Sequence, residues 1–260
     1  GQIVCNGHVW FDSVTNRFMT PQQRGIGYVP QHYGLFPHMT AIENICAGLH
    51  TLDVNERLSR AHSWLARMHL TGLGERKPAE LSGGQQQRVA VARALAGDPS
   101  ILLLDEPFSA VDSATRDKLH GELAELKAQL AIPIILVTHD LTEALLLADR
   151  IALLNQGKTL QAGPPGEIMM RPATEEAARL IGLRNLFDGE VVDHVRETPA
   201  TLVRFGRYLL ESAYRPEFQA GSAVRWGIPE SGIRFRPITR HAPVPQQNLI
   251  EVDVPRLLAL

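Results

Sequence analysis

The sequence predicts an α/β fold, with a mostly parallel sheet and a small all-β region after it. Between residues 25 and 162, short runs rich in Ile, Val and Leu alternate with segments that carry helix start signals. After Pro172, short alternating segments are separated by Gly and Pro, as in a small β domain. We therefore expect an α/β part over residues 1–183 and a β accessory part over residues 184–260.

The composition excludes several classes of protein. The chain has 260 residues, 44% of them hydrophobic, and is long enough to bury a core. Its formal net charge of -2 provides no basic surplus for nucleic acid, so we expect no nucleic-acid partner. Cys5 and Cys46 lack the spacing of a zinc site or a disulfide scaffold. No apolar run approaches the ~18 residues of a membrane span, so a membrane role would act through a partner.

Buried strands are expected where short apolar runs are rich in β-branched residues and Leu. These runs are IGYVP (26–30), ILLLD (101–105), IPIILVT (132–138) and RIALLN (150–155). Helices are expected between them, because a capping box, in which a side-chain oxygen accepts from free backbone N–H groups, marks a helix start. The pairs of this type are Thr40 with Glu43, Ser82 with Gln85, and Asp140 with Glu143. Gly97, followed by Asp98-Pro99, ends the helix that begins at Ser82.

Two adjacent carboxylates, Asp105 and Glu106, follow the apolar run of ILLLDEP. This position is the carboxyl edge of the predicted sheet, where open α/β sheets bind ligands. Acidic side chains there are suited to holding Mg²⁺ and orienting water against a phosphate. The alternative is that Asp105 caps a turn and Glu106 is solvated, and this short motif alone does not distinguish the two.

The stretch LSGGQ starts a helix with a small hydroxyl, Ser82, and two glycines, Gly83 and Gly84. Bare N–H groups and the positive end of the helix dipole would face outward there, which makes an anion site. The glycines let a phosphate approach the backbone without interference from a Cβ. The alternative is an ordinary Ser N-cap beside a flexible Gly pair.

Together these segments resemble the ATP-binding subunits of ABC transporters, which implies a P-loop-NTPase-like sheet with an inserted helical subdomain. YVPQ supplies the Q-loop glutamine, Gln31, and LSGGQ is the signature motif. ILLLDEP is the Walker B strand, SAVD is the D-loop that ends at Asp112, and LVTHD contains the switch histidine, His139. Five motifs in this order over residues 28–140 are far more specific than any one of them.

The resemblance implies a role for each residue, with ATP and Mg²⁺ as cofactors. Asp105 would hold Mg²⁺ through water, and Gln31 would approach the metal and the attacking water. Glu106 would act as general base or polarise the attacking water, and His139 would contact the γ-phosphate. Ser82, Gly83, Gly84, Gln85 and Asp112 would complete the nucleotide site.

The resemblance also implies partners. In this family the signature motif touches the ATP held by the opposite subunit, so we expect a homodimer with two shared sites. The mainly helical stretch of about residues 32–82 would be the helical subdomain, whose surface around 32–44 receives a transmembrane permease subunit. Phe36 and Met39 are candidate docking anchors, although core packing is the commoner fate of such residues. The protein would then be peripheral, on the cytoplasmic face of the inner or plasma membrane.

One expected motif, the P-loop GxxxxGK[S/T], is not found upstream of Gln31. The sequence starts with GQIVCNG, which is typical of the strand that follows a P-loop, so we expect the α/β part to be N-terminally incomplete and the β part to be cut short. GKT at 157–159 is not a P-loop, because Ala152 stands at the place of its first glycine and a hairpin turn explains it better. We therefore expect weak or absent ATP binding by this chain alone.

The transported solute is indicated only by a general sequence pattern. LFPHMT, together with the tail from Arg171, resembles importers of molybdate and related oxyanions, a pattern that sulfate, iron, polyamine and sugar importers largely share. Two alternatives to an importer ATPase are a non-catalytic fragment or regulatory module and a soluble ABC-type ATPase. The charge balance and the importer-like tail count against the second.

Overall fold

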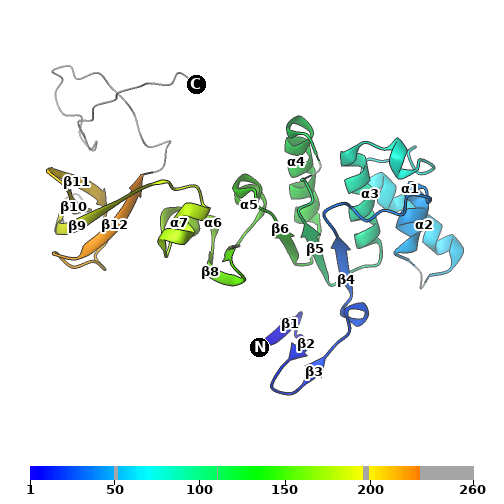
Figure 1. The fold of residues 1–260 in the computed structure, drawn as a ribbon. Coiled ribbons are helices and arrows are strands. Elements are labelled where there is room, and N and C mark those ends of the chain that lie inside the picture. Colours follow the sequence, from blue (N-terminus) through cyan, green and yellow to red (C-terminus); the bar gives the residue numbers. More distant parts are fainter. Residues whose placement is uncertain (50–51, 110, 196–198, 229–260) are drawn as a thin grey trace. The chain divides into compact units, whose positions relative to one another are not determined.

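The computed structural model describes residues 1–49, 52–109, 111–195 and 199–228. The chain forms two compact units, Gly1–Ile151 and Ala152–Leu260, and the second is described as far as Ile228 (Figure 1). The first unit contains all five predicted motifs. None of the helices in the described ranges combines the length and the apolar character that a membrane crossing requires.

The first unit begins with an antiparallel sheet of three strands, β1 (Gln2–Cys5), β2 (His8–Asp12) and β3 (Arg17–Phe18). Its first turn places Asn6 and Gly7 at positive φ, 47° and 78°, as a two-residue hairpin requires. The strand expected in GQIVCNG is therefore present.

The central sheet confirms the predicted parallel architecture. Its strands are β4 (Ile26–Val29), β5 (Ile101–Asp105) and β6 (Ile134–Val137), all parallel in the order β4-β5-β6. All three run in one direction, so their carboxyl ends meet at one edge, where Asp105 pairs in register with Val137. The residues that directly follow these strands are thereby brought close together.

The helical subdomain expected over about residues 32–82 stays a prediction, and three helices of the described structure lie in this range. They are α1 (Ala41–Ala47), α2 (Val54–Arg67) and the 3-10 helix η2 (Pro78–Glu80), with η1 (Pro21–Arg24) before β4. The others are α3 (Gly83–Ala96), α4 (Ser113–Gln129) and α5 (Leu141–Leu147). One apolar core joins α1, α2 and α3 to Leu102 and Leu104 of β5 and to Phe108, which is fully buried.

Two of the three predicted capping boxes are present, at Thr40 with Glu43 and at Ser82 with Gln85, and Gly97 caps the end of α3. The third is only half correct. Asp140 accepts from the backbone N–H groups that open α5, but the Glu143 carboxylate does not return to the backbone of Asp140. It accepts a hydrogen bond from Thr138 instead, because it is buried in contact with that hydroxyl.

In the second unit, β7 (Ile151–Asn155) and β8 (Lys158–Gly163) form a hairpin. Gln156 and Gly157 make its turn at positive φ, 46° and 75°. Lys158 thus starts a strand rather than a helix, which confirms that Gly157 belongs to a hairpin turn and that GKT at 157–159 is not a phosphate-binding loop.

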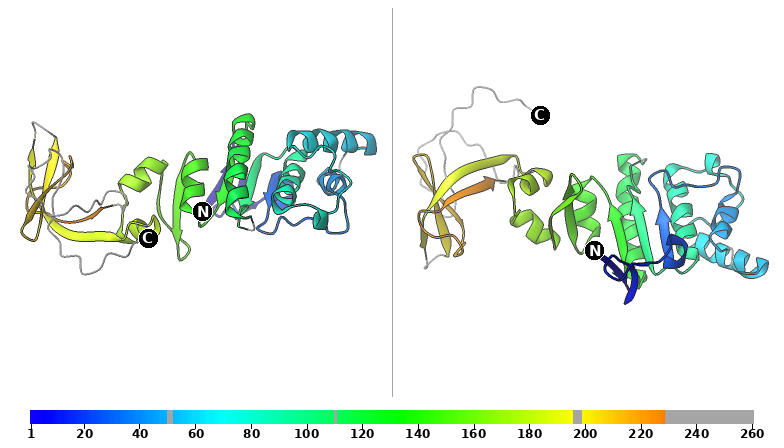
Figure 2. Two further views of the ribbon diagram at one scale, coloured as in Figure 1. Left: turned by 90° about the horizontal axis from the view of Figure 1, so that it is seen from above. Right: turned by 60° about the horizontal axis from the view of Figure 1, so that its bottom comes forward.

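Two short helices follow, α6 (Pro165–Met170) and α7 (Glu175–Leu180). The strands β9 (Asn185–Val195), β10 (Ala200–Phe205), β11 (Tyr208–Ala213) and β12 (Ala223–Ile228) then form an antiparallel sheet in the order β11-β10-β9-β12. They are the yellow to orange arrows of Figure 2. The division predicted after residue 183 falls between α7 and β9 and stays a prediction. The remainder of the predicted β part, residues 229–260, lies outside the described residues.

Candidate active site

Glu106 lies directly after β5 with its backbone in the left-handed region, at φ 43°. For a residue with a Cβ this conformation is disfavoured and needs support from its surroundings. The support comes from both sides: the Glu106 N–H donates to Val137 O (2.9 Å), and the Glu106 carbonyl accepts from Ser109 Oγ (2.9 Å). Such a held, disfavoured backbone is typical of a functional position.

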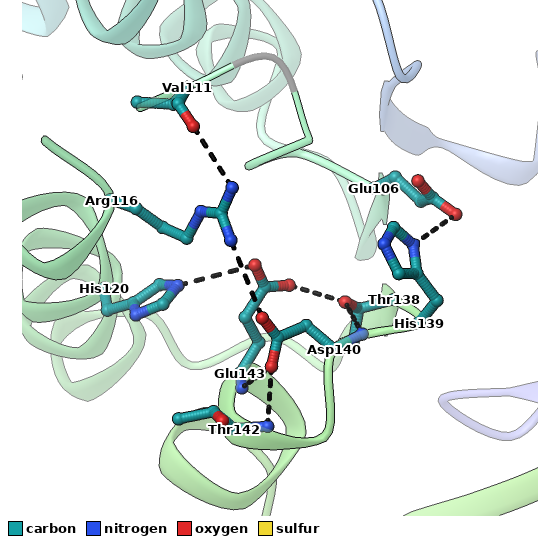
Figure 3. Close-up of polar contacts among 9 residues, drawn as sticks. All are labelled: Glu106, Val111, Arg116, His120, Thr138, His139, Asp140, Thr142 and Glu143. Carbon is teal, nitrogen blue, oxygen red and sulfur yellow. Dashed lines mark hydrogen bonds and ion pairs between the residues drawn. The ribbon is translucent and has the colours of Figure 1, made fainter. Parts of the chain in front are cut away.

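The Glu106 carboxylate joins the ends of all three parallel strands. Gln31, after β4, donates from Nε2 to Glu106 Oε2 (3.2 Å). His139, after β6, places Nδ1 3.0 Å from Glu106 Oε1 (Figure 3). Three residues named from separate sequence motifs therefore meet at one carboxylate.

The pairing with Glu106 changes the acid–base behaviour of His139. Its side chain is 76% exposed, and the hydrogen bond to Glu106 together with the charge of that carboxylate raises the pKa of His139 above the ordinary 6.5. The pKa is higher in the folded protein than in the unfolded chain. The pair therefore stabilises the fold fully below about pH 6.5 and loses this contribution as the pH rises through the folded pKa.

We expect an NMR titration of the His139 imidazole to give a pKa above 6.5, and Glu106→Gln to bring it back toward that value. The amide of Gln has no charge to stabilise the imidazolium, which is why the shift should disappear. Equal pKa values in the two proteins would show that Glu106 and His139 do not interact in solution.

Asp105, beside Glu106, meets a residue that the sequence analysis missed. The Tyr28 hydroxyl on β4 donates to Asp105 Oδ2 (3.3 Å). Partial burial and then the Asp105 charge raise the pKa of Tyr28, so the phenol stays protonated and can donate. The sequence alone does not predict this contact, because it depends on the register between β4 and β5. In that register Tyr28 pairs with Leu103.

The residues at this edge fit a magnesium ion held jointly with phosphate oxygens. The Asp105 carboxylate and the Gln31 side-chain carbonyl are hard oxygen ligands of the kind that Mg²⁺ takes. Within the described ranges, no group of three or more His, Cys, Asp or Glu side chains could hold a metal ion. A metal here would therefore need oxygens from water and from a bound phosphate, which is the usual situation for Mg²⁺.

A polar cleft continues from Glu106 along the segment that carries His139 (Figure 3). Its lining residues are Glu106, Ser109, Arg116, Thr138, His139, Asp140 and Glu143. Arg116 spans it, with Nη1 3.6 Å from Asp140 Oδ2 and Nη2 donating to Val111 O (3.2 Å). Burial alone would raise the pKa of Asp140, but hydrogen bonds from Thr142 and Glu143 and the charge of Arg116 outweigh it and lower that pKa.

The signature residues lie apart from these groups. Ser82 is exposed at the start of α3, where its hydroxyl accepts from Gln85 N (3.3 Å) and its N–H donates to Gln85 Oε1 (2.9 Å). Gly83 and Gly84 form the first turn of this 14-residue helix. Asp112 is exposed immediately before α4, and its carbonyl accepts from Arg116 N (2.9 Å). In the described structure, the side chains of Ser82 and Gln85 bond locally and not to Glu106 or His139.

Comparison with known proteins supports the resemblance to ATP-binding subunits of ABC transporters. The family model described as ABC transporter matches residues 1–109. The spermidine/putrescine import ATP-binding protein PotA 1 of Pseudomonas aeruginosa is 42% identical over 211 residues, which are 78% of this chain and 56% of that protein. The sulfate/thiosulfate import ATP-binding protein CysA 2 of Agrobacterium fabrum is 44% identical over 187 residues, or 70% and 55% of the two chains. The chain thus spans about half the length of the curated relatives it matches.

A solved structure extends the likeness to three dimensions. It is the ATP-binding cassette MJ0796 in a dimeric post-hydrolysis state bound to ADP and Pi, with a TM-score of 0.52 and 34% sequence identity. The likeness covers 64% of this chain and 73% of that one. Because an identity of 34% over most of a solved cassette exceeds what a shared architecture alone produces, the chain belongs to the ATP-binding cassette family of ABC transporter ATPases.

Proposed function

We propose that this chain is the ATP-hydrolysing subunit of an ABC import system. The observation that carries the proposal is the meeting of Gln31, Glu106 and His139 at the carboxyl edge of the parallel sheet. A regulatory module without catalysis would have no need for a strained Glu106 held between these two partners. The import role is supported by the likeness to PotA 1 and CysA 2, both named as import ATP-binding proteins.

In this proposal Glu106 takes the proton of the attacking water as general base. Gln31 and His139 hold its two oxygens, so that the carboxylate has a fixed direction. His139, with its raised pKa, would place a cation near the γ-phosphate of ATP and stabilise the charge there. Asp105 and Gln31 would hold Mg²⁺, which supplies charge neutralisation at the β- and γ-phosphates when bound.

The signature segment would serve a second copy of the chain. At the start of α3, Ser82 is exposed, Gly83 and Gln85 are half-buried and Gly84 is buried. This helix start would offer backbone N–H groups and the positive helix end to an anion. Because these residues lie apart from Glu106 within one chain, we infer that they close on the ATP of the partner, together with Asp112. The similar MJ0796 cassette, whose solved structure is dimeric, supports this arrangement.

ATP-dependent dimerisation tests the proposed function. We expect the full-length Glu106→Gln subunit to dimerise when ATP and Mg²⁺ are added, because bound ATP then persists between the two copies. Adding Ser82→Arg should abolish the dimer, since a large side chain fills the anion site at the start of α3. Ser59→Arg, the same change at an exposed position of α2, is the control and should still dimerise. Light scattering after gel filtration that shows no ATP-dependent dimer, or one unaffected by Ser82→Arg, would contradict the shared-site proposal.

Weak ATP binding by residues 1–260 alone stays a prediction, and the experiments with ATP proposed for this protein therefore use the full-length subunit. These residues contain no GxxxxGK[S/T] sequence, and in GKT at 157–159 the glycine lies in the β7–β8 turn while Lys158 and Thr159 start β8. The Lys and hydroxyl that grip the β- and γ-phosphates in P-loop proteins therefore have no counterpart in them.

We further infer that transmembrane permease subunits are the partners, and that the protein works at the cytoplasmic face of the membrane as a peripheral subunit. Of the two candidate anchors, Phe36 is 42% exposed, whereas Met39 is half-buried. Phe36 is therefore the better docking candidate. Relatives named for polyamine and for sulfate import support solute uptake, but they give no support to the molybdate preference drawn from the sequence.

A further inference from the structure

Behind the exposed His139, α5 contains a carboxylate, Glu143, that is only 4% exposed. We propose that Glu143 is a positioning residue for His139: through the Thr138 hydroxyl it fixes the short segment from which His139 reaches Glu106. The inference rests on the proposed function, because it assigns Glu143 to the orientation of a residue in the ATP site. The contacts that support it are drawn in Figure 3.

The first contact joins Glu143 to Thr138. The Thr138 hydroxyl donates to Glu143 Oε2 over 2.5 Å, a length typical of a hydrogen bond to an ionised carboxylate. Such bonds are about twice as strong as bonds between neutral groups, and in a buried place water does not compete with them. The Thr138 rotamer is therefore set by α5 and not by solvent.

The second contact joins Thr138 to Asp140. The same hydroxyl oxygen accepts from the backbone N–H of Asp140 (3.0 Å), and the Asp140 carboxylate accepts in turn from the backbone N–H groups of Thr142 (2.7 Å) and Glu143 (3.4 Å). His139 thus lies between two residues whose side chains are both tied to the start of α5. With both neighbours fixed, the imidazole is directed toward Glu106, 3.0 Å away.

Helix α4 also contributes a side chain beside the Glu143 carboxylate. His120 is 7% exposed, packs edge-on against Phe108, and has Nε2 3.6 Å from Glu143 Oε1. Within the described structure neither ring nitrogen of His120 has a hydrogen-bond partner, so this residue offers Glu143 proximity but no hydrogen bond. Arg116, one turn earlier on α4, faces Asp140 instead. The Thr138 hydroxyl is therefore the strong side-chain partner of Glu143.

The burial of Glu143 is difficult to explain by stability alone. A carboxylate removed from water costs free energy that one hydroxyl and one nearby imidazole without a hydrogen bond to it offset only in part. An apolar side chain of similar size would fill the space between α4 and α5 with less penalty. Retaining the carboxylate serves a directional purpose, which is to hold Thr138 in the one rotamer that also binds Asp140.

The test uses a matched pair at Thr138 in the protein. Thr138→Val keeps the side-chain shape and removes the hydroxyl, whereas Thr138→Ser keeps the hydroxyl; Thr71→Val, at an exposed position, is the control. We expect Thr138→Val to shift the His139 imidazole resonances measured without nucleotide. It should also lower kcat for ATP hydrolysis about tenfold with KM changed less than twofold, because a misdirected His139 affects the reaction more than ATP binding. Thr138→Ser and Thr71→Val should resemble the original protein.

A second variant covers the case in which Thr138→Val does not fold. Glu143→Gln keeps the shape but weakens the bond to Thr138, and we expect a smaller displacement of the His139 resonances in the same direction. Unchanged His139 resonances in a folded Thr138→Val or Glu143→Gln protein would overturn the proposal, even if the melting temperature fell. Because the resonances are recorded without ATP, they test the positioning of His139 even where hydrolysis fails to appear.

Discussion

Glu106→Gln is expected to slow ATP hydrolysis by about 10²- to 10⁴-fold, the range that a positioned general base contributes. The amide keeps the shape and the hydrogen bond to Gln31, but it cannot accept a proton from water. ATP binding should persist, because the proton transfer that the amide prevents belongs to the transition state and not to the bound ground state.

Single-turnover hydrolysis at saturating Mg-ATP measures this effect directly. Glu125→Gln, the same change at an exposed position of α4, is the matched control and should leave the rate within about twofold. A Glu106→Gln protein that hydrolyses ATP at the original rate would show that the base lies elsewhere.

Asn44→Ala is expected to lower the free energy of unfolding by about 3 kcal/mol. Asn44, on α1, has 0% exposure and is fully hydrogen-bonded. Its Nδ2 donates to the carbonyls of Phe36 (3.1 Å), Met39 (3.2 Å) and Thr40 (3.0 Å), and its Oδ1 accepts from Phe36 N (2.8 Å). Alanine would leave several of these backbone groups without that partner in a place with little water, and each one adds to the loss.

Urea unfolding of Asn44→Ala beside Asn55→Ala checks this value. Asn55 is exposed on α2, so its replacement should change stability by less than about 0.5 kcal/mol. The segment between Phe36 and Thr40 follows the Q-loop and includes the proposed permease contact. A loss at Asn44 no larger than at Asn55 would mean that Asn44 does not hold this segment.

The sequence analysis located the central sheet correctly because buried parallel strands leave a signal that needs no tertiary information. Short runs of Ile, Val and Leu predicted β4, β5 and β6 within a few residues. Gln31, Glu106 and His139 each lie within two residues of the carboxyl end of one of these strands. The order of the motifs gave the same three residues, and the structure brings them together.

The contacts that the sequence did not predict depend on how separate elements pack. Tyr28 contacts Asp105 only because of the β4–β5 register. Glu143 was expected to cap α5, since its spacing from Asp140 fits a capping box. The packing of α4 against α5 buries its carboxylate beside Thr138 and His120 instead. Local patterns describe the start of a helix well, but they contain no information about which helix will cover it.

A structure of the Glu106→Gln protein with ATP and Mg²⁺ tests the central claim most directly. We expect the γ-phosphate to lie beside residue 106 and His139, with Asp105 near the metal and Ser82 of a second copy on the same nucleotide. A nucleotide bound away from the carboxyl edge of the β4-β5-β6 sheet, or one that contacts neither residue 106 nor His139, would contradict the assignment of this edge as the site of hydrolysis.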